Sequence, residues 1–119
     1  MKKTVILGAT DNPDRFAYRA AHSLVRHGYP VALVGIKKGV VAGQDIMNGK
    51  PAIADVDTVT LYVGPRNQPE WYDYILNLQP RRIIFNPGTE NQELEKKAQE
   101  KGIQTVEGCT LVMLSAGMY

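Results

Sequence analysis

The chain has 119 residues, of which 44% are hydrophobic and 22% are charged, and its formal net charge at pH 7 is +2. This length suits one hydrophobic core, so the sequence predicts a single domain over residues 1–119. The basic residues are scattered and not interleaved with aromatic residues, which argues against nucleic-acid binding. The lone Cys109 excludes an intrachain disulfide, and with two histidines five positions apart, His22 and His27, no metal site is predicted.

No apolar run is long enough to cross a bilayer. The apolar segment that follows the first lysines ends at Asp11, and no region resembling a cleavage site follows it. The sequence therefore predicts a cytoplasmic protein without membrane contact.

Short runs rich in Val, Ile and Leu alternate along the chain with amphipathic segments. Runs of this kind, little interrupted by charge, are typical of parallel strands that are buried on both faces. The predicted strands are residues 4–7, 31–36, 58–63, 82–85 and 103–106.

The first predicted helix has Asn12 as its N-cap, Pro13 at its first position and Gly28 after its end. Its predicted buried stripe is Ala17, Ala21 and Leu24, and its predicted water-facing residues are Arg15, Arg19, His22 and Arg26. Further helices are predicted over about residues 69–78 and 91–101, and a short one after Cys109. Trp71 falls on the apolar stripe of the second helix, which favours a core position over a base-stacking one.

Residues 37–56 break the alternation, because glycines and a proline replace the crossover helix expected there. We predict a long loop with one turn of helix near Ile53. A long loop at the carboxyl end of a strand usually contacts ligand.

The pattern predicts an α/β fold, a doubly wound five-stranded parallel sheet of the Rossmann-like type. Its ligand crevice is expected beside the first strand, where the strand order reverses. Three segments would line it, the loops after Gly8, Ile36 and Val63.

The first strand runs into a glycine turn and then directly into a helix start. The first turn of a helix leaves backbone N–H groups without intrahelical partners, and together with the helix dipole these favour an anion. A nucleotide is the expected ligand. Asp11 and Asp14 oppose a phosphate there, although Asp14 also suits the first turn of a helix.

The dinucleotide fingerprint is absent, because the next glycine after Gly8 is Gly28 and no acidic residue ends the second strand. Lys37 and Lys38 stand there instead and could pair with a phosphate on the ribose, as in NADP or coenzyme A. The alternative is an exposed turn with solvated lysines. The acidic residues of a receiver domain and the Gly-Lys-Ser/Thr of a P-loop are also missing.

The sequence resembles the small stand-alone CoA-binding proteins, which are close in design to the CoA-binding domain at the start of the succinyl-CoA synthetase alpha subunit. The resemblance covers nearly the whole chain. Its motifs are Gly-Ala-Thr and Asn-Pro within residues 5–13, His-Gly-Tyr-Pro-Val at 27–31, residues 88–91 and Glu-Gly-Cys at 107–109.

The resemblance implies a cofactor, coenzyme A, and places it on the three loops. It implies that Gly8, Ala9, Thr10 and Asn12 cradle the pyrophosphate and that Arg15 reaches it from the first turn. Lys37 and Lys38 then meet the ribose phosphate, and Val63, Gly64 and Arg66 border the adenine and the neighbouring sugar. Gly35 belongs to the same site, but the family commonly has Asn-Pro where this chain has Gly35-Ile36.

Several nearby residues have a structural interpretation beside the functional one. Arg15 and Arg66 suit solvated surface positions as well as ligand contacts. Tyr18 suits packing beside the loop. Gly88, Thr89 and Asn91 suit a turn and cap before the third helix.

No catalytic residues are predicted. Cys109 is the one candidate nucleophile, and the sequence assigns no histidine to it as a base. The synthetase uses a phosphorylated histidine from a further domain, which is absent from these 119 residues.

The predicted function is binding of CoA or acyl-CoA, without catalysis by this chain alone. One alternative is an NADP-dependent reductase. Another is an interaction scaffold with a vestigial nucleotide site, a homo-oligomer or a partner of another protein. The apolar residues available for such a contact, for which core packing is the alternative, are Met113, Leu114, Met118 and Tyr119.

Overall fold

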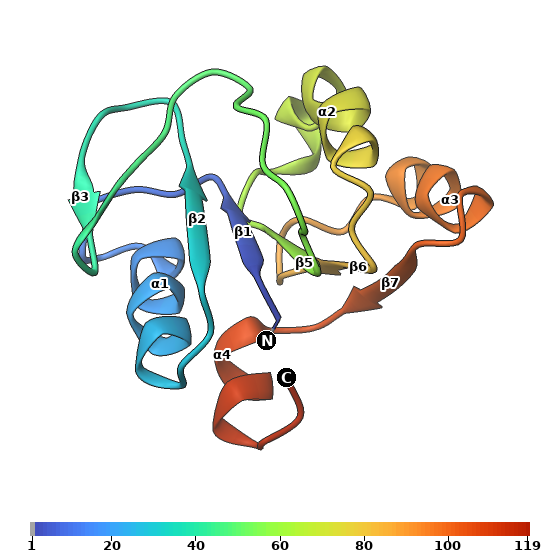
Figure 1. Cartoon of the computed structure of the whole chain (residues 1–119). Coiled ribbons are helices and arrows are strands. Elements are labelled where there is room, and N and C mark those ends of the chain that lie inside the picture. Colours follow the sequence, from blue (N-terminus) through green and yellow to red (C-terminus); the bar gives the residue numbers. More distant parts are fainter. Residues whose placement is uncertain (1) are drawn as a thin grey trace.

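The computed structural model describes residues 2–119. One sheet contains five parallel strands in the order β2-β1-β5-β6-β7 (Figure 1). The strands are β1 (Thr4–Leu7), β2 (Val31–Val34), β5 (Thr58–Leu61), β6 (Arg82–Phe85) and β7 (Gln104–Glu107). The order reverses between β1 and β5, which is the switch point of a doubly wound sheet. The predicted α/β fold with a five-stranded parallel sheet is confirmed.

Helices cover both faces of the sheet. α1 (Phe16–Arg26) and α4 (Thr110–Ser115) lie on one face, and α2 (Tyr72–Asn77) and α3 (Gln92–Glu100) lie on the other (Figure 1). The 3-10 turns η1 (Pro65–Asn67) and η2 (Pro69–Trp71) precede α2. None of the helices within residues 2–119 is long and apolar enough to span a bilayer.

The two faces of the sheet bury separate apolar clusters. The predicted stripe of α1, Ala17, Ala21 and Leu24, packs in one cluster, and Trp71 packs in the other, which confirms its core position. Every residue of β1, β2, β5 and β6 is buried. Their near-continuous apolar runs follow from this coverage on both faces.

The predicted start of α1 is wrong. The helix begins at Phe16, its N-cap is Arg15, and no side chain caps it. The side-chain oxygen of Asn12 accepts instead from the amide of Asp14 at 3.0 Å, and the Asn12 carbonyl accepts from the amide of Arg15 at 3.1 Å. Asn12 therefore closes a turn of its own, and this turn separates Pro13 from the helix.

The start of α3 agrees with the prediction. The side-chain oxygen of Asn91 accepts from the amide of Leu94 at 3.2 Å, which caps the helix. Leu94 and Ala98 are its buried residues, as its narrow apolar stripe predicts.

Residues 37–56 contain a β-hairpin that the sequence analysis did not predict, and no helical turn forms near Ile53. β3 (Val40–Val41) pairs antiparallel with β4 (Gln44–Asp45). The connecting residues Ala42 and Gly43 both have positive φ, +52° and +77°, which suits the tight turn of a hairpin. The turn has Ala-Gly in place of the Asn-Gly or Asp-Gly pair that would have marked it in the sequence.

Tyr119 belongs to the core. Its side chain is 7% exposed, its phenol pairs with the hydroxyl of Thr4, and its ring lies edge-on to Tyr29 with centroids 4.9 Å apart. The guanidinium carbon of Arg82 is 4.3 Å from the centroid of the same ring. Core packing therefore accounts for Tyr119, and Leu114 is buried as well.

We expect Tyr119→Phe to lower the free energy of unfolding by about 1 kcal/mol, because the phenol bond to Thr4 is lost. Tyr119→Ala should lower it by about 3–5 kcal/mol, because a cavity is added. Urea unfolding measures both changes. Met118→Ala is the control, since Met118 is 74% exposed, and its effect should stay within about 0.5 kcal/mol. Equal effects at the two positions would contradict the core placement of Tyr119.

Candidate functional site

The loop after β1 is held in backbone contact with the ends of two neighbouring strands. Gly8 has a φ of +97°, and a β-carbon on it would lie 2.7 Å from the carbonyl oxygen of Tyr62. A β-carbon on Gly35 would lie 2.3 Å from the carbonyl oxygen of Ala9. Both glycines are therefore required by the fold, independently of any ligand.

The loop after β2 turns back to the same place. A β-carbon on Gly39 would lie 2.8 Å from a carboxylate oxygen of Asp11. The side-chain amide of Asn48 donates to the carbonyls of Gly35 and Lys37, at 2.8 Å and 3.1 Å, and so fastens this loop to the segment that follows the hairpin. Lys37 and Lys38 are exposed, and they directly precede Gly39, whose backbone meets Asp11 of the loop after β1.

The turn after β1 has fewer free donors than its sequence predicts. The amides of Gly8 and Ala9 both donate to the carbonyl of Val34, at 2.9 Å each, and the amide of Asn12 donates to the hydroxyl of Thr10 at 3.2 Å. Within the described chain, the amides of Thr10 and Asp11 make no such bond. These two amides and the first turn of α1 are the donors left for an anion. A ligand role for Gly8, Ala9 and Asn12 stays a prediction.

The start of α1 contributes a cation. Arg15 is exposed at the N-cap position, next to Asp14 and within the segment that leads from the crevice into the helix. Tyr18 is half-buried, and its ring centroid lies 4.7 Å from that of His22. Tyr18 thus packs against its own helix.

The loop after β5 is open to a ligand. Gly64 has no atom within 4 Å of the position that a β-carbon would take. Val63 is half-buried beside it, and Arg66 is exposed in η1. The three loops predicted to line the crevice therefore do lie at one edge of the sheet, the edge formed by the carboxyl ends of its strands (Figure 1).

A buried glutamine that the sequence analysis missed holds the loops after β5 and β6 together. Gln68 is 0% exposed, and its amide nitrogen donates to the carbonyls of Val63 and Thr89 at 2.8 Å each. Its amide oxygen accepts from the side chain of Asn91 at 2.8 Å. The segment of Thr89 and Asn91 thus serves as the turn and cap of α3.

A second buried amide, Asn86, ties α4 to the sheet. It is 2% exposed, and its nitrogen donates to the hydroxyl of Thr60 at 2.7 Å and the carbonyl of Leu61 at 2.8 Å. Its oxygen accepts from the amide of Thr110 at 2.9 Å. The start of α4 is thereby fixed at the carboxyl edge.

Tyr62 places a phenol near Thr60 and Thr110, at the start of α4. Its hydroxyl is buried and has no hydrogen-bond partner within the described chain. Burial raises the pKa of Tyr62 from 10.0 to about 12, against the opposing effect of the nearby Thr110 hydroxyl. The phenol therefore stays protonated at neutral pH. Cys109, which also raises this pKa slightly, is half-buried just before α4.

The charges exposed around the crevice favour an anionic ligand. Its cations are Arg15, Lys37, Lys38 and Arg66, and its acids are Asp11 and Asp14. Among residues 2–119, no group of three or more His, Cys, Asp and Glu side chains is placed to hold a metal ion. The arrangement can bind a phosphorylated molecule through backbone amides and cations, with no acid–base pair assembled beside it.

Comparison with known proteins adds a family and a close structural relative. The family model described as CoA binding domain matches residues 2–115. A crystal structure of a protein described as uncharacterized is 59% identical, with a TM-score of 0.98 over 100% of this chain and 98% of the other. No curated protein matches the chain.

More distant structures share the architecture. A Thermus thermophilus protein is 23% identical, with a TM-score of 0.87 over 99% of this chain and 90% of that one, and at this identity it shows the fold alone. A hypothetical protein from Pyrococcus horikoshii OT3 is 28% identical, with a TM-score of 0.84 over 97% and 82% of the two chains.

The raised pKa of Tyr62 predicts a stability loss at alkaline pH. The unfolded chain releases the phenol proton near the ordinary value of 10.0, whereas the folded chain holds it until about 12. The contribution is therefore complete below pH 10 and is lost as the pH rises through 12, by up to about 2–3 kcal/mol. We expect Tyr62→Phe to reduce this loss, as measured by urea unfolding at pH 8 and at about pH 11.

At pH 8 the same variant should change the free energy of unfolding by less than about 1 kcal/mol, because no hydrogen bond is broken. Tyr18→Phe is the matched control for loss of a phenol. An alkaline profile of Tyr62→Phe that coincides with that of the parent chain would contradict the assignment.

Proposed function

The chain belongs to the CoA binding domain family, whose model covers residues 2–115, and from this membership we propose that it binds coenzyme A or an acyl-CoA at the carboxyl edge of the sheet. The observation that carries the proposal is the convergence of three loops at the switch point, with Gly8, Gly35 and Gly39 in contact with their neighbours. Ligands of doubly wound sheets bind at this point.

In this proposal the ADP moiety lies across the start of α1. The amides of Thr10 and Asp11, together with the first turn of the helix, donate to the pyrophosphate. Arg15 adds a charge from the N-cap position. Gly8, Ala9 and Asn12 shape the turn, since their own amides are engaged within the fold.

The ribose phosphate of CoA is assigned to Lys37 and Lys38. Both are exposed on a loop whose backbone Asn48 holds in place, so the ligand would order only the side chains. The adenine and its sugar are assigned to Val63, Gly64 and Arg66. Gly64 leaves room for a base, and a guanidinium can stack on its face.

We further propose that this chain has no catalytic activity of its own. Its two histidines are engaged on α1, since His22 packs on Tyr18 and His27 Nδ1 donates to the carbonyl of Ser23 at 2.7 Å. Cys109 therefore has no assigned base. The pantetheine arm and any acyl group would be presented to another protein.

Isothermal titration of nucleotide-stripped protein with CoA, dephospho-CoA, NADP and ADP tests the proposal. We expect saturable binding of CoA, tighter than that of dephospho-CoA and NADP. Dephospho-CoA lacks the phosphate on the ribose, and NADP lacks the pantetheine arm, so only CoA has both groups. Preference for NADP would favour the alternative reductase. Absence of binding by all four ligands would contradict a nucleotide site and favour an interaction scaffold.

The double variant Lys37→Ala, Lys38→Ala should weaken CoA binding by about 1–3 kcal/mol while changing dephospho-CoA little, because the charge-assisted bonds to the ribose phosphate are lost. Titration of both ligands measures the difference. Lys96→Ala, Lys97→Ala is the matched control, an exposed pair of adjacent lysines on α3. Equal weakening of CoA and dephospho-CoA binding would contradict the assignment of the two lysines to the ribose phosphate.

A further inference from the structure

A hollow on the outer side of α1 begins next to the proposed CoA site. Its volume is about 570 Å³, which suits a small molecule, and Pro13 lies in its lining. Pro13 follows two positions after Asp11, whose amide is one of the donors left for the pyrophosphate. The hollow, which we call the α1 groove, therefore opens beside the place where the pyrophosphate is proposed to bind.

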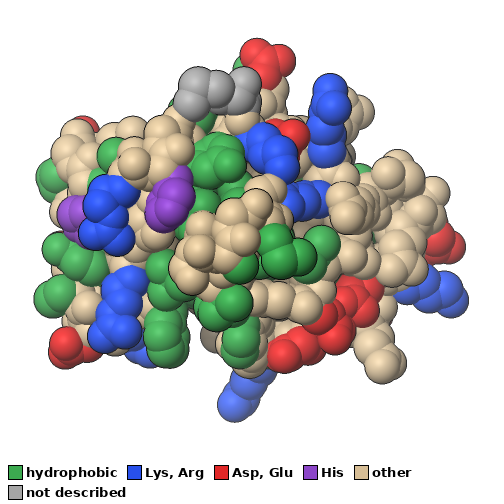
Figure 2. All heavy atoms as spheres, turned by 90° about the horizontal axis from the view of Figure 1, so that it is seen from below, with side chains coloured by type: hydrophobic (Ala, Val, Ile, Leu, Met, Phe, Trp, Pro, Cys, Tyr) green, Lys and Arg blue, Asp and Glu red, His purple; other side chains and the backbone are tan. Residues whose placement is uncertain are grey.

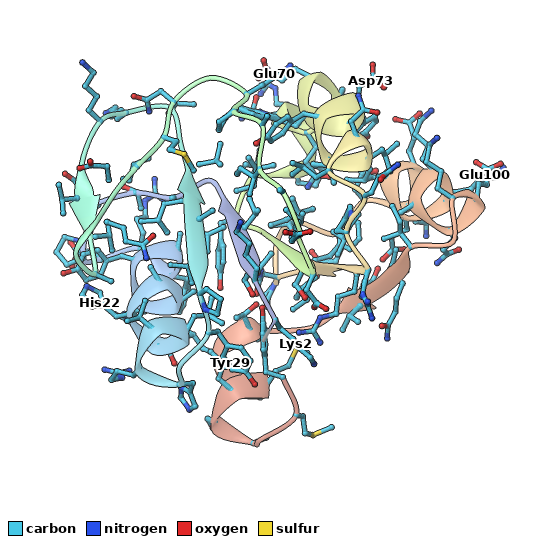
Figure 3. The ribbon with its side chains drawn as sticks, in the orientation of Figure 1. Lys2, His22, Tyr29, Glu70, Asp73 and Glu100 are labelled. Atoms are coloured by element: carbon cyan, nitrogen blue, oxygen red, sulfur yellow. The ribbon has the colours of Figure 1, made fainter. Side chains whose placement is uncertain are left out.

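The groove follows α1 away from the crevice and reaches α4. Its lining residues Tyr18, Arg19, His22 and Arg26 recur at spacings that place them along one side of the helix. Leu111 of α4 completes the lining. Figure 3 shows His22 on the side of α1 that faces away from the sheet. The groove therefore lies on the surface of the molecule, where a ligand can enter it from solvent.

The lining of the groove carries positive charge and no acidic side chain. Arg19 and Arg26 are exposed, and α1 contains no Asp or Glu. The guanidinium carbon of Arg19 lies 5.5 Å from the centroid of the Phe16 ring, and a guanidinium on a ring keeps its N–H donors for an anion. Figure 2 shows basic and histidine side chains together at its left, the side on which α1 lies in Figure 1.

The sign of the charge changes along the groove. The exposed Asp11 and Asp14 stand on either side of Pro13 in the chain, whereas Arg19 and Arg26 lie further along. A neutral part of a ligand suits the first region and a negatively charged group suits the second. The pantetheine arm of CoA is neutral, so a thioester whose acyl group ends in a carboxylate has the matching distribution of charge.

The length of the arm agrees with the length of the helix. From its phosphate oxygen to its sulfur the arm has about twelve bonds, so it spans about 14 Å at the spacing of an extended backbone. α1 extends about 15 Å from Phe16 to Arg26, at about 1.5 Å per residue. An arm that starts at the pyrophosphate therefore brings its sulfur alongside the second half of α1. An acyl chain of about five carbons adds about 6 Å and reaches the last turn, where Arg26 lies.

We propose that the α1 groove binds the acyl-pantetheine arm of an acyl-CoA and selects a dicarboxylic acyl group, whose free carboxylate pairs with Arg19 and Arg26. The inference rests on the proposed binding of CoA at the start of α1. A long aliphatic acyl chain is disfavoured, because it would cover the two guanidinium groups without replacing their bonds to water. Since the groove lies on the surface, the bound thioester stays accessible to another protein.

Isothermal titration with glutaryl-CoA and valeryl-CoA tests the groove. The two acyl chains have equal length, and only the glutaryl chain ends in a carboxylate. We expect glutaryl-CoA to bind at least about tenfold more tightly than valeryl-CoA, because its carboxylate makes charge-assisted bonds to the guanidinium groups. The ratio of the two dissociation constants should fall at high salt, since the groove is open to solvent.

The variant Arg19→Gln, Arg26→Gln should reduce this ratio to about one, because both cations are lost. Far-ultraviolet circular dichroism and the unfolding temperature check that the variant is folded. Lys96→Gln, Lys97→Gln is the matched control for the loss of two positive charges, since both lysines are exposed on α3, which covers the other face of the sheet. The control should keep the ratio of the parent chain.

Equal affinity of the parent chain for the two thioesters would overturn the acyl assignment and leave CoA binding itself intact. A preference for glutaryl-CoA that the arginine variant retains would also overturn it, because the carboxylate would then lie elsewhere, for example at Lys37 and Lys38. Absence of binding by CoA and by both thioesters would contradict the proposed function, and this inference with it.

Discussion

The candidate site depends on one constraint, the close approach of the loop after β1 to the ends of β2 and β5. Gly8 and Gly35 permit this approach, since a β-carbon on either would overlap a carbonyl oxygen of the neighbouring segment. The carbonyl of Val34 accepts from two successive amides, those of Gly8 and Ala9, and so fixes the turn from the β2 side. The backbone at the switch point is therefore set by the fold before any ligand arrives, which lowers the entropy cost of binding.

A second level of order comes from buried amide side chains. Gln68 joins the loops after β5 and β6, and Asn86 joins β5, β6 and the start of α4. A buried amide is stabilising only when its donors and acceptors are paired, so each loop is positioned by the others. The cations of the crevice stand on this fixed backbone but remain exposed themselves. Figure 3 draws the side chains on the ribbon and labels Glu70, Asp73 and Glu100, which are exposed around α2 and α3. The same edge thus combines rigid donors with adaptable charges.

The parts that local patterns determine were predictable from the sequence, and those that depend on distant partners were not. The five strands, to within one or two residues at their ends, the α3 cap at Asn91 and the core position of Trp71 follow from periodicity and capping residues. Asn12 misled the prediction because an asparagine can cap a helix or close its own turn, and the local sequence does not distinguish the two. Gln68 and Asn86 bond to residues more than 20 positions away, so no nearby pattern marks them. The hairpin was not predicted because Ala42 and Gly43 make its turn in place of an Asn-Gly or Asp-Gly pair, and an alanine does not signal a positive φ.

α1 supplies the helix start of the proposed CoA site, and the way it is held determines whether a ligand could move it. Its first turn faces the crevice. Ala17, Ala21 and Leu24 are almost fully buried against the sheet, so the helix has no alternative packing to which a ligand could shift it. A ligand can shift only an element that has two states for which its affinity differs. A helix fixed in this way provides no such element, so CoA is expected to bind without moving α1.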